Sequence, residues 1–287
     1  MFNELVTLYP ITTYIILGIL SLIIGSLLNV IIYRLPLMLH EEWSSQCREL
    51  LHLPDEPHDK INLFLPRSFC PNCKVIIPIW HNIPLISYCL LRGSCSNCQQ
   101  SIPFRYPLIE ALSLGLALMA AWSFGFNLTL FIVLLFIWLL ICLFFIDLQH
   151  QLLPDVLTFS LLWIGLIANT QSLFTSLPNA VLSAAGAYLA LWSFINLFYL
   201  LTHKVGMGHG DFKLLAAFGA WFGWTQLPLI LLLSSISGAI IGIIYLRKTA
   251  QTKETPIPFG PFLCLSGLIS LFYGKAILQW YFHFFMP

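Results

Sequence analysis

Two aspartates stand at the ends of long apolar stretches in a chain that carries little charge. Asp147 closes an apolar run over 131–146, and Asp211 follows Gly208-His209-Gly210 just before another apolar stretch. A carboxylate at the centre of a membrane-spanning helix costs at least ~2.5 kcal/mol, so such a residue usually has a function. Two carboxylates in one site can share a proton and activate a water molecule. The pattern predicts a carboxylate pair for acid–base hydrolysis.

The composition indicates that these residues lie in a membrane. The chain has 287 residues, of which 59% are hydrophobic and 9% charged, whereas soluble domains average about 25% charged residues. We predict an all-α, polytopic membrane protein that contacts lipid, with no basic patch of the kind that binds nucleic acid. About eight segments are apolar enough to be transmembrane helices, although the sixth is short: 11–33, 106–124, 128–146, 156–172, 178–202, 212–224, 227–246 and 260–284.

The basic residues of the connections predict the orientation. Of the 13 Lys and Arg residues, seven lie in 34–105, two flank the fifth-to-sixth connection and three follow the seventh segment. With eight spans these three clusters share one side, which the positive-inside rule assigns to the cytoplasm, leaving both termini outside. The same topology brings Asp147 and Asp211 to the cytoplasmic face. The predicted divisions are a first transmembrane helix over 1–33, a cytoplasmic loop over 34–105 and a seven-helix core over 106–287.

The cytoplasmic loop carries paired cysteines with the spacing of a metal site. Two Cys-x-x-Cys units, Cys70 with Cys73 and Cys95 with Cys98, supply four thiolates for a tetrahedral structural Zn²⁺. Disulfides or free thiols are the alternatives, and the reducing cytoplasm disfavours disulfides. Metal binding would fold a proline-rich loop that has no adequate core of its own. Outside these units, four cysteines are expected to be small buried or loop residues: Cys47, Cys89, Cys142 and Cys264.

The residues before Asp211 are expected to approach a substrate. Three glycines in the stretch from Gly206 to Gly210 would permit positive φ angles and close backbone contact, which a mere helix cap does not need. We therefore assign Gly208, His209 and Gly210 to substrate binding.

Other polar residues at the apolar segments have simpler explanations. Asp155 is expected to complement the N-terminal dipole of a helix, and Glu110 to pair with Arg105 or with a polar group across the bundle. A metal site built from His150, His209 and the aspartates is a weaker alternative to a carboxylate pair.

The chain resembles the type IV prepilin leader peptidases, which are bifunctional peptidases and N-methyltransferases of the bacterial inner membrane. The resemblance rests on motifs spread over the whole chain: 25–36, the two cysteine units, 82–84, 105–110, 147–155, 206–215 and 257–261. It implies that Asp147 and Asp211 are the catalytic pair. It also implies that the substrates are prepilins and type II secretion pseudopilins, whose basic leader is removed at the cytoplasmic face of the membrane.

The resemblance further implies methylation of the new N-terminus by S-adenosylmethionine. No glycine-rich strand-turn-helix motif for that cofactor is present, so this activity rests on the resemblance alone. By the same resemblance, we place Glu42, Arg92 and Gly93 near the methyl-transfer site.

Two other classes of protein fit parts of the pattern. A transporter would use intramembrane carboxylates for proton coupling, but these acids lie at one face and no internal repeat is visible. A zinc-dependent membrane hydrolase needs an open metal position, whereas the four cysteines would fill all four positions.

Overall fold

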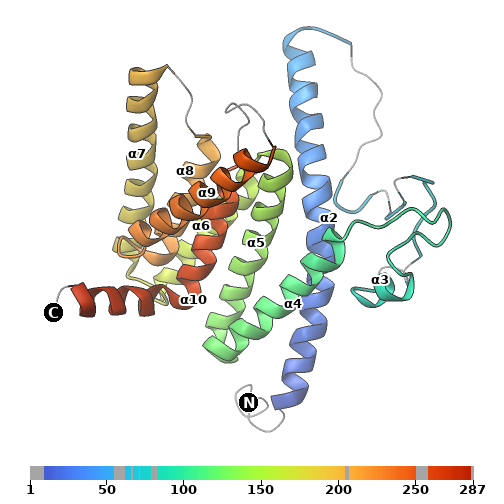
Figure 1. Cartoon of the computed structure of the whole chain (residues 1–287), viewed down its shortest axis with the longest axis horizontal. Helices are drawn as coiled ribbons and strands as arrows, with labels where there is room; N and C mark the ends of the chain where they lie inside the picture. The colour runs from blue at the N-terminus through green and yellow to red at the C-terminus, as the bar shows by residue number, and fades with distance from the viewer. Residues whose placement is uncertain are drawn as a thin grey trace. The chain divides into compact units, whose positions relative to one another are not determined.

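The computed structural model describes residues 10–54, 62–65, 67–70, 72–78, 80, 83–203, 207–249 and 258–285. Within these ranges the chain is almost entirely helical, with only two isolated β-bridges, which confirms the predicted all-α class (Figure 1). Six of the described helices are long and apolar enough to cross a membrane, and two shorter helices, Asp155–Thr170 and His209–Phe222, occupy the positions of predicted spans. The helices group into two compact units, residues 1–130 and 131–287.

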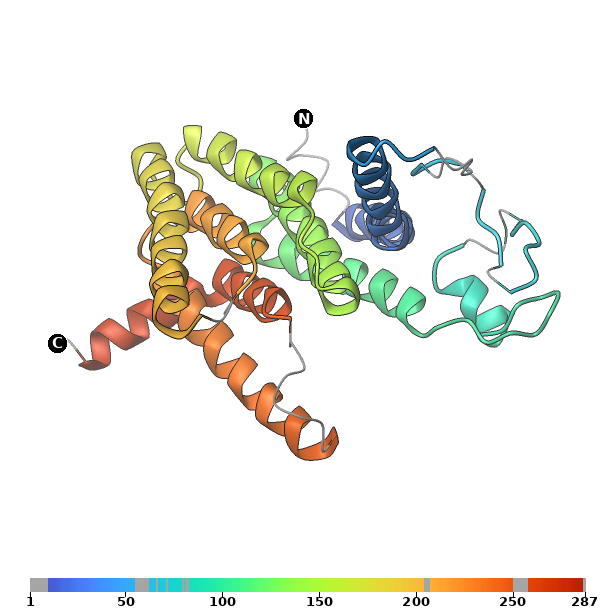
Figure 2. The same ribbon diagram turned by 90° about the horizontal axis from the view of Figure 1, so that it is seen from above.

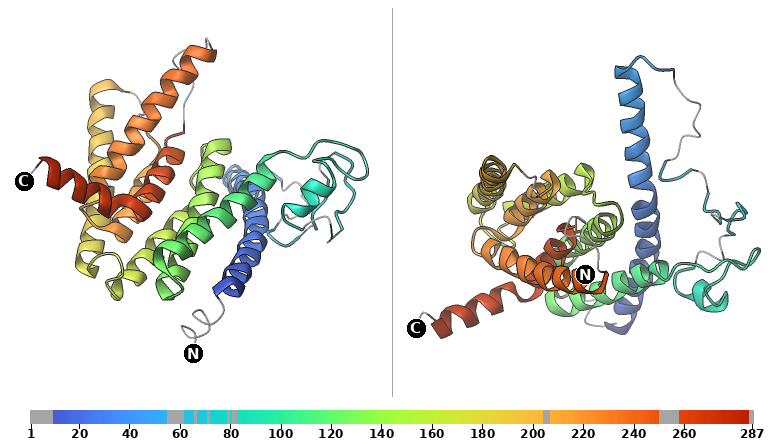
Figure 3. Two further views of the ribbon diagram at one scale, coloured as in Figure 1. Left: turned by 60° about the horizontal axis from the view of Figure 1, so that its bottom comes forward. Right: turned by 45° about the horizontal axis from the view of Figure 1, so that its top comes forward.

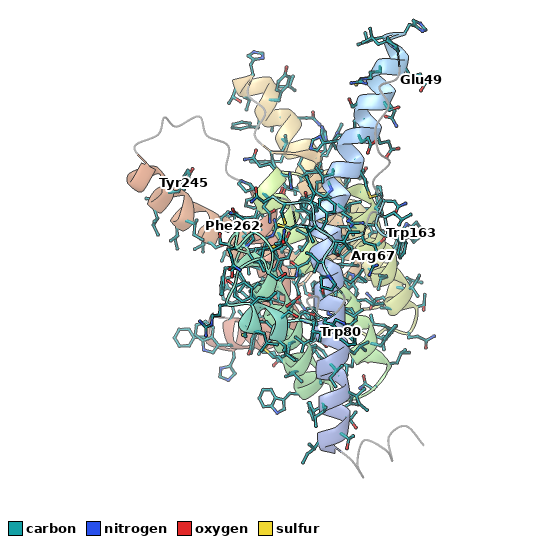
Figure 4. The ribbon with its side chains drawn as sticks, turned by 90° about the vertical axis from the view of Figure 1, so that its right-hand side faces the viewer. Glu49, Arg67, Trp80, Trp163, Tyr245 and Phe262 are labelled. Atoms are coloured by element: carbon teal, nitrogen blue, oxygen red, sulfur yellow. The ribbon has the colours of Figure 1, made fainter. Side chains whose placement is uncertain are left out.

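The first unit is built on one very long helix. Helix α2 (Pro10–Leu50) runs through Pro36 and ends well beyond position 33, where the apolar pattern stops. The predicted first segment, 11–33, covers only the apolar part of this helix, and residues 34–50, which we assigned to the loop, are also helical and contain good helix formers such as Leu, Met and Glu. Glu49 marks the last turn of this helix in Figure 4. The unit also contains α3 (Ile86–Leu90) and α4 (Arg105–Phe124).

Helices α2 and α4 pack closely because a glycine lies at their contact. A Cβ atom on Gly25 would lie 2.9 Å from the Cα atom of Glu110, so no larger residue fits without movement. Ser113 Oγ donates to the carbonyl oxygen of Ser21 at 2.7 Å, and Asn29 Nδ2 donates to that of Tyr106 at 3.1 Å. Small residues and interhelical hydrogen bonds of this kind are typical of helix contacts in membranes.

The second unit surrounds a short central helix. Most of α5 (Leu128–His150) belongs to this unit, together with α6 (Asp155–Thr170), α7 (Leu177–Thr202), α8 (His209–Phe222), α9 (Leu227–Thr249) and α10 (Gly260–Phe285). Helix α8 contacts α6, α7, α9 and α10, and nearly all of its residues are buried (Figures 2 and 3). Its aromatic side chains also pack on α5, where the rings of Phe136 and Trp221 lie 4.5 Å apart.

The short length of α8 is compatible with a membrane because its end is buried in protein. Its 14 residues span about 21 Å, less than the ~30 Å hydrocarbon core. Asn169 Nδ2 donates to the terminal carbonyl oxygens of Ala220 and Trp221 at 2.7 and 3.1 Å, and Gly223 turns the chain with a φ of 71°. Polar groups at a helix end need such partners where no water reaches them. The structure thus satisfies this end of α8 inside the protein.

The outward faces of the helices carry large apolar side chains. Trp163 on α6 is 61% exposed and Tyr245 on α9 is 44% exposed (Figure 4). Exposed apolar residues of this size extend along most of the described helices, as a lipid-facing surface requires. This distribution supports the interpretation as a multi-pass membrane protein.

Candidate active site

Asp147 lies in the last turn of α5, shortly before the chain turns toward α6. Its side chain is only 5% exposed. Gln151 N–H donates to the Asp147 carbonyl oxygen and has a positive φ of 52°, which ends the helix, and Pro154 then precedes the first residue of α6. The turn holds the Asp147 carboxylate at the end of α5, as the sequence predicted.

Asp211 lies in the first turn of α8, directly after the glycine-containing segment. It is 7% exposed, and its backbone N–H donates to the carbonyl oxygen of Gly208, the residue that precedes the helix. Its position at a helix N-terminus places the carboxylate where the helix dipole favours negative charge.

The structure brings the two carboxylates into one neighbourhood. Asp147 and Asp211 lie near enough for their charges to interact, and the buried thiol of Cys264 on α10 lies near enough to interact with both. Leu153 joins their surroundings: a Cβ atom on Gly210 would lie 2.8 Å from Leu153 Cβ, and one on Gly260 would lie 3.2 Å from Leu153 Cδ1. The ends of α5, α8 and α10 therefore meet at this point.

Each carboxylate keeps one oxygen free for chemistry. Among the described residues, no hydrogen-bond partner reaches Asp147 Oδ2 or Asp211 Oδ1, and both atoms are buried. Leaving a buried polar oxygen unpaired costs about 1–3 kcal/mol, so such atoms are unusual outside functional sites. Two buried carboxylates with unpaired oxygens can bind a reacting water or a carbonyl group.

The described glycines before Asp211 do not have the backbone conformation that we expected, whereas their assignment to substrate binding stays a prediction. Gly208 has a φ of −75°, and Gly210 lies within α8, so neither adopts the positive φ that we predicted, while Gly206 lies outside the described residues. Gly210 instead lacks a side chain because Leu153 occupies that space. His209 is exposed, and its ring packs against Phe212 at 5.3 Å.

The two other acids at the apolar segments, Asp155 and Glu110, each have a polar partner. Asp155 lies in the first turn of α6, as predicted, and its Oδ1 accepts a hydrogen bond from Lys213 Nζ at 2.6 Å. Glu110 Oε2 accepts from the backbone N–H of Leu85 at 2.8 Å, and the Ser26 hydroxyl on α2 contacts the same carboxylate. The expected polar partner of Glu110 across the helix pair is therefore Ser26.

The four paired cysteines form one cluster in the first unit. Their Sγ atoms all lie within 4.8 Å of one another, and the cluster could hold a metal ion. Each pair sits in a tight turn beside a β-bridge, Phe69 with Ile76 and Ser94 with Ser101, so the two turns have the same form. In the part of the chain that the structure describes, no other group of His, Cys, Asp or Glu converges in this way, so the alternative site with His150 and His209 gains no support.

Backbone N–H groups of the two turns lower the pKa of one thiol in each turn, Cys73 and Cys95. The backbone N–H of Val75, with help from the Asn97 side chain, lowers the pKa of Cys73 to about 6. The backbone N–H groups of Cys98 and Asn97 lower the pKa of Cys95 in the same way. Thiolates are the form that binds metal, so the lowered pKa values suit Cys73 and Cys95 to metal binding. All eight cysteines are free thiols in the structure, and the Cys70 and Cys98 sulfurs are 3.7 Å apart.

The residues placed near the methyl-transfer site lie apart from the aspartates in sequence and belong to the first unit. Glu42 is exposed on α2 and accepts a hydrogen bond from Gln46. Arg92 is exposed in the turn after α3, with a positive φ of 49°. Gly93 has a φ of 69°, and a Cβ atom there would lie 3.0 Å from the hydroxyl of Tyr88.

Sequence reasoning missed two residues that shape the aspartate site. Gly260 was noted only as part of the 257–261 motif, yet a Cβ atom there would lie 2.5 Å from Asp147 Oδ2. Leu153 was missed because an apolar residue before Pro154 carries no chemical signal. A signal for Gly260 existed in its Phe-Gly-Pro setting at the start of the last apolar segment.

The fold and the site together define a class. A multi-pass helical membrane protein whose helix ends bring two buried aspartates together has the fold and the paired carboxyl groups that an intramembrane peptidase needs. Residues 19–124 match the bacterial peptidase A24 N-terminal domain, and residues 134–243 match the type IV leader peptidase family. The chain belongs to the type IV leader peptidase family and is an enzyme.

Similar proteins cover the whole chain. It is 60% identical over 287 residues to a prepilin leader peptidase/N-methyltransferase of Legionella pneumophila, with 100% of both chains covered. Proteins of the same name from Stutzerimonas stutzeri and Pseudomonas aeruginosa are 51% and 50% identical, with 93% and 92% of this chain and 92% of each relative covered. No solved structure matches the chain at a significant level.

Proposed function

We propose that the chain removes the basic leader from type IV prepilins and type II secretion pseudopilins, with Asp147 and Asp211 as the catalytic pair. The observation that carries this proposal is the meeting of two buried carboxylates, each with an unpaired oxygen, at the ends of α5 and α8. Membership of the leader peptidase family and the names of the relatives supply the substrate class.

The chemistry is acid–base hydrolysis without a covalent intermediate. One carboxylate takes a proton from water, and the water oxygen bonds to the scissile carbonyl carbon while the other carboxyl gives its proton to the carbonyl oxygen. The carbon–nitrogen bond then breaks, and the leaving amine takes a proton from the pair. Burial of both groups supports this assignment, because a water-poor site strengthens the interaction of each carboxyl with the reacting atoms. Gly208, His209 and Gly210, just before Asp211, would line the path of the substrate.

The proposed location is the bacterial inner membrane, with the peptidase site facing the cytoplasm and both termini in the periplasm. The distribution of Lys and Arg supports this orientation. A leader that is basic and cytoplasmic would present the cleavage point at the depth of these helix ends. Lys204 and Lys253, which contribute to the charge pattern, lie outside the described residues.

The second activity is methylation of the new N-terminal amine, with S-adenosylmethionine as methyl donor. The names of the relatives support it, since each includes an N-methyltransferase activity. We retain Glu42, Arg92 and Gly93 as candidates for this activity. When bound, the donor supplies an electrophilic methyl group, and the protein must hold the free amine in line with it.

The cysteine cluster is proposed to hold a structural Zn²⁺. Zinc–sulfur bonds of about 2.3 Å in a tetrahedron place sulfur atoms about 3.8 Å apart, and the Cys70 and Cys98 sulfurs are separated by 3.7 Å. Four thiolate ligands leave no open position for a water, so this metal would support the loop rather than take part in hydrolysis.

One reaction mixture tests both activities. Purified protein in detergent is incubated with a prepilin and S-adenosylmethionine, and mass spectrometry reads leader loss and methylation separately. We expect Asp147→Asn and Asp211→Asn each to abolish cleavage while the protein stays folded in the membrane. A prepilin supplied without its leader should still be methylated by both variants. Processing by Asp211→Asn at the wild-type rate would remove the proposed role of the pair.

A further inference from the structure

The first unit contains a cavity that neither the peptidase chemistry nor the metal cluster explains. Its volume is about 390 Å³, within the ~300–1,000 Å³ of small-molecule sites. Helices α2 and α4 form one wall, and α3 with segments 68–78 and 95–103 of the loop form the other. We propose that this cavity is the binding site for S-adenosylmethionine, an inference that rests on the methyltransferase activity proposed above.

Two oppositely charged side chains are buried in the wall of the cavity. Glu110 on α4 and Arg34 on α2 both line it, and each is only 8% exposed. Leu85 N–H holds the Glu110 carboxylate at 2.8 Å, and Arg34 Nη1 donates to the carbonyl oxygen of Asn62 at 2.9 Å. Charged groups are rarely buried so fully unless a partner or a ligand makes use of them. The methionine end of the donor carries both an ammonium and a carboxylate, and this pair of side chains offers a complement to each.

A third buried polar side chain lies in the wall of the same cavity. Asn29 lines the wall and is 5% exposed, and its Nδ2 donates to the carbonyl oxygens of Gly25 and Tyr106. Its Oδ1 has no hydrogen-bond partner among the described residues. A buried amide oxygen without a partner is costly, and a ligand donor such as an amino or hydroxyl group would satisfy it.

The rest of the lining suits the two other parts of the donor. Four aromatic side chains contribute to the cavity: Tyr33, Phe69, Tyr88 and Tyr106. A sulfonium is a cation without hydrogen-bond donors, so aromatic faces and a carboxylate are the groups that stabilise it. The flat, weakly polar adenine ring also favours an aromatic and aliphatic slot with a few amide groups. Asn97 and Gln100 supply such amides.

The cavity lies beside the cysteine cluster, and one of the candidate methyltransferase residues, Gly93, contacts a residue of its lining. Cys70 and Cys95 belong to its lining, so the turns that would bind the metal also shape this wall. Gly93 does not line it, but a side chain at Gly93 would collide with the hydroxyl of Tyr88, which does. Glu42 and Arg92 are likewise absent from the described lining. Gly93 is therefore a positioning residue for Tyr88 in this scheme.

The test measures donor binding, methylation and cleavage on the same full-length protein. Isothermal titration calorimetry with S-adenosylmethionine gives Kd, and peptides with and without a leader report cleavage and methylation. We expect Glu110→Gln to raise Kd at least tenfold and Tyr33→Ala to raise it several-fold, with cleavage within twofold of wild type. Retained cleavage shows that each variant is folded. Glu49→Gln, an exposed acid in the last turn of α2 (Figure 4), is the matched control and should leave Kd unchanged.

The outcomes separate this proposal from the activity on which it rests. If wild-type protein binds the donor and both cavity variants bind it equally well, the cavity is not the site, although the methyltransferase proposal stands. If wild-type protein neither binds the donor nor methylates the peptide, both proposals fail together. A selective loss of binding and methylation in both cavity variants supports the assignment.

Discussion

The backbone of Gly260 lies directly against the carboxylate of Asp147. A Cβ atom at position 260 would be 2.5 Å from Asp147 Oδ2 and 3.0 Å from its Cγ, far inside van der Waals contact. The backbone N–H of Gly260 also interacts with this carboxylate. The first residue of α10 thus sets the position of an aspartate at the end of α5, and only glycine allows this approach.

Replacement of Gly260 should impair cleavage without unfolding the protein. Gly260→Ala would push the Asp147 carboxylate away from its partner, and a displacement of about 1 Å in a catalytic group can cost about 100-fold in rate. We expect a loss of this order in kcat for leader cleavage, measured by mass spectrometry. Gly238→Ala on α9 is the matched control, because the nearest atoms to a Cβ atom there belong to Phe262, at an ordinary contact distance of 3.4 Å. A Gly260→Ala enzyme with wild-type kcat would contradict the role of this contact.

Asp155 should be dispensable for cleavage although it lies close to Asp147 in sequence. Its carboxylate is half exposed and pairs with Lys213, and exposed pairs of this kind contribute about 0–1 kcal/mol. We expect Asp155→Asn to keep more than half of the wild-type cleavage rate, in contrast to Asp147→Asn. The same assay run side by side on the two variants checks this. Equal loss in both variants would place Asp155 in the catalytic machinery.

Asn169 should be important for stability because it holds the end of α8. Its amide donates to the carbonyl oxygens of Ala220 and Trp221, and its Oδ1 accepts from the backbone N–H groups of Phe174 and Thr175. Replacing it by Ala leaves the buried carbonyl oxygens at this helix end without their partner, at a cost of about 1–3 kcal/mol. We expect Asn169→Ala to lower Tm in detergent by several degrees, measured by thermal unfolding.

The control for this prediction is another asparagine on a helix of the same unit. Asn196 is exposed on α7 and donates only to the carbonyl oxygen of Trp192, one turn away. Asn196→Ala should therefore leave Tm nearly unchanged. A similar Tm for Asn169→Ala and wild type would mean that other groups satisfy the end of α8.

The amino-acid sequence was sufficient for the parts of the structure that depend on composition and spacing. Apolar segments of sufficient length predicted the helices, because a membrane allows few other structures for such stretches. Repeated Cys-x-x-Cys spacing predicted a cluster that the structure confirms. The aspartates were recognised because a carboxylate at an apolar helix end is rare, and the structure places both at helix ends in one buried neighbourhood.

Features that depend on contacts between distant segments were not visible in the sequence. Gly210 was expected to permit positive φ and close approach of a substrate, and its close contact with the Leu153 side chain was not predicted. The continuation of α2 to Leu50 was missed because the apolar run that defined the first segment ends at 33 and the residues beyond it are more polar. The cavity around Glu110 is formed by α2, α4 and the cysteine loop together, so no local sequence pattern predicts it.

Removal of the metal ligands should affect the first unit alone. Purified protein should contain one zinc per cysteine cluster, measured by elemental mass spectrometry. Cys73→Ser should lower the zinc content by more than half and reduce methylation, because metal binding contributes to folding of the loop. Cleavage should be retained, since its aspartates belong to the other unit. Cys47→Ser, at an exposed cysteine on α2, is the control and should keep its zinc.

Loss of cleavage on mild chelation, with the protein still folded, would instead indicate a metal-dependent peptidase.

Gly210 and Leu153 should be energetically coupled because the Leu153 side chain occupies the space that a side chain at position 210 would need. Gly210→Ala places a methyl group 2.8 Å from Leu153 Cβ, which would shift the start of α8 and with it Asp211. Leu153→Ala keeps Cβ but removes Cδ1 and Cγ, which a Cβ atom on Gly210 would meet at 3.2 and 3.5 Å, so it relieves the collision in part and also loses packing against Gly210 and Gly260. Each single variant should therefore reduce the cleavage rate. The double variant should be more active than the product of the two losses predicts, with a coupling of about 0.5–3 kcal/mol as found for residues in contact. Rates for the four proteins complete the cycle, and purely multiplicative losses would show that this contact does not position Asp211.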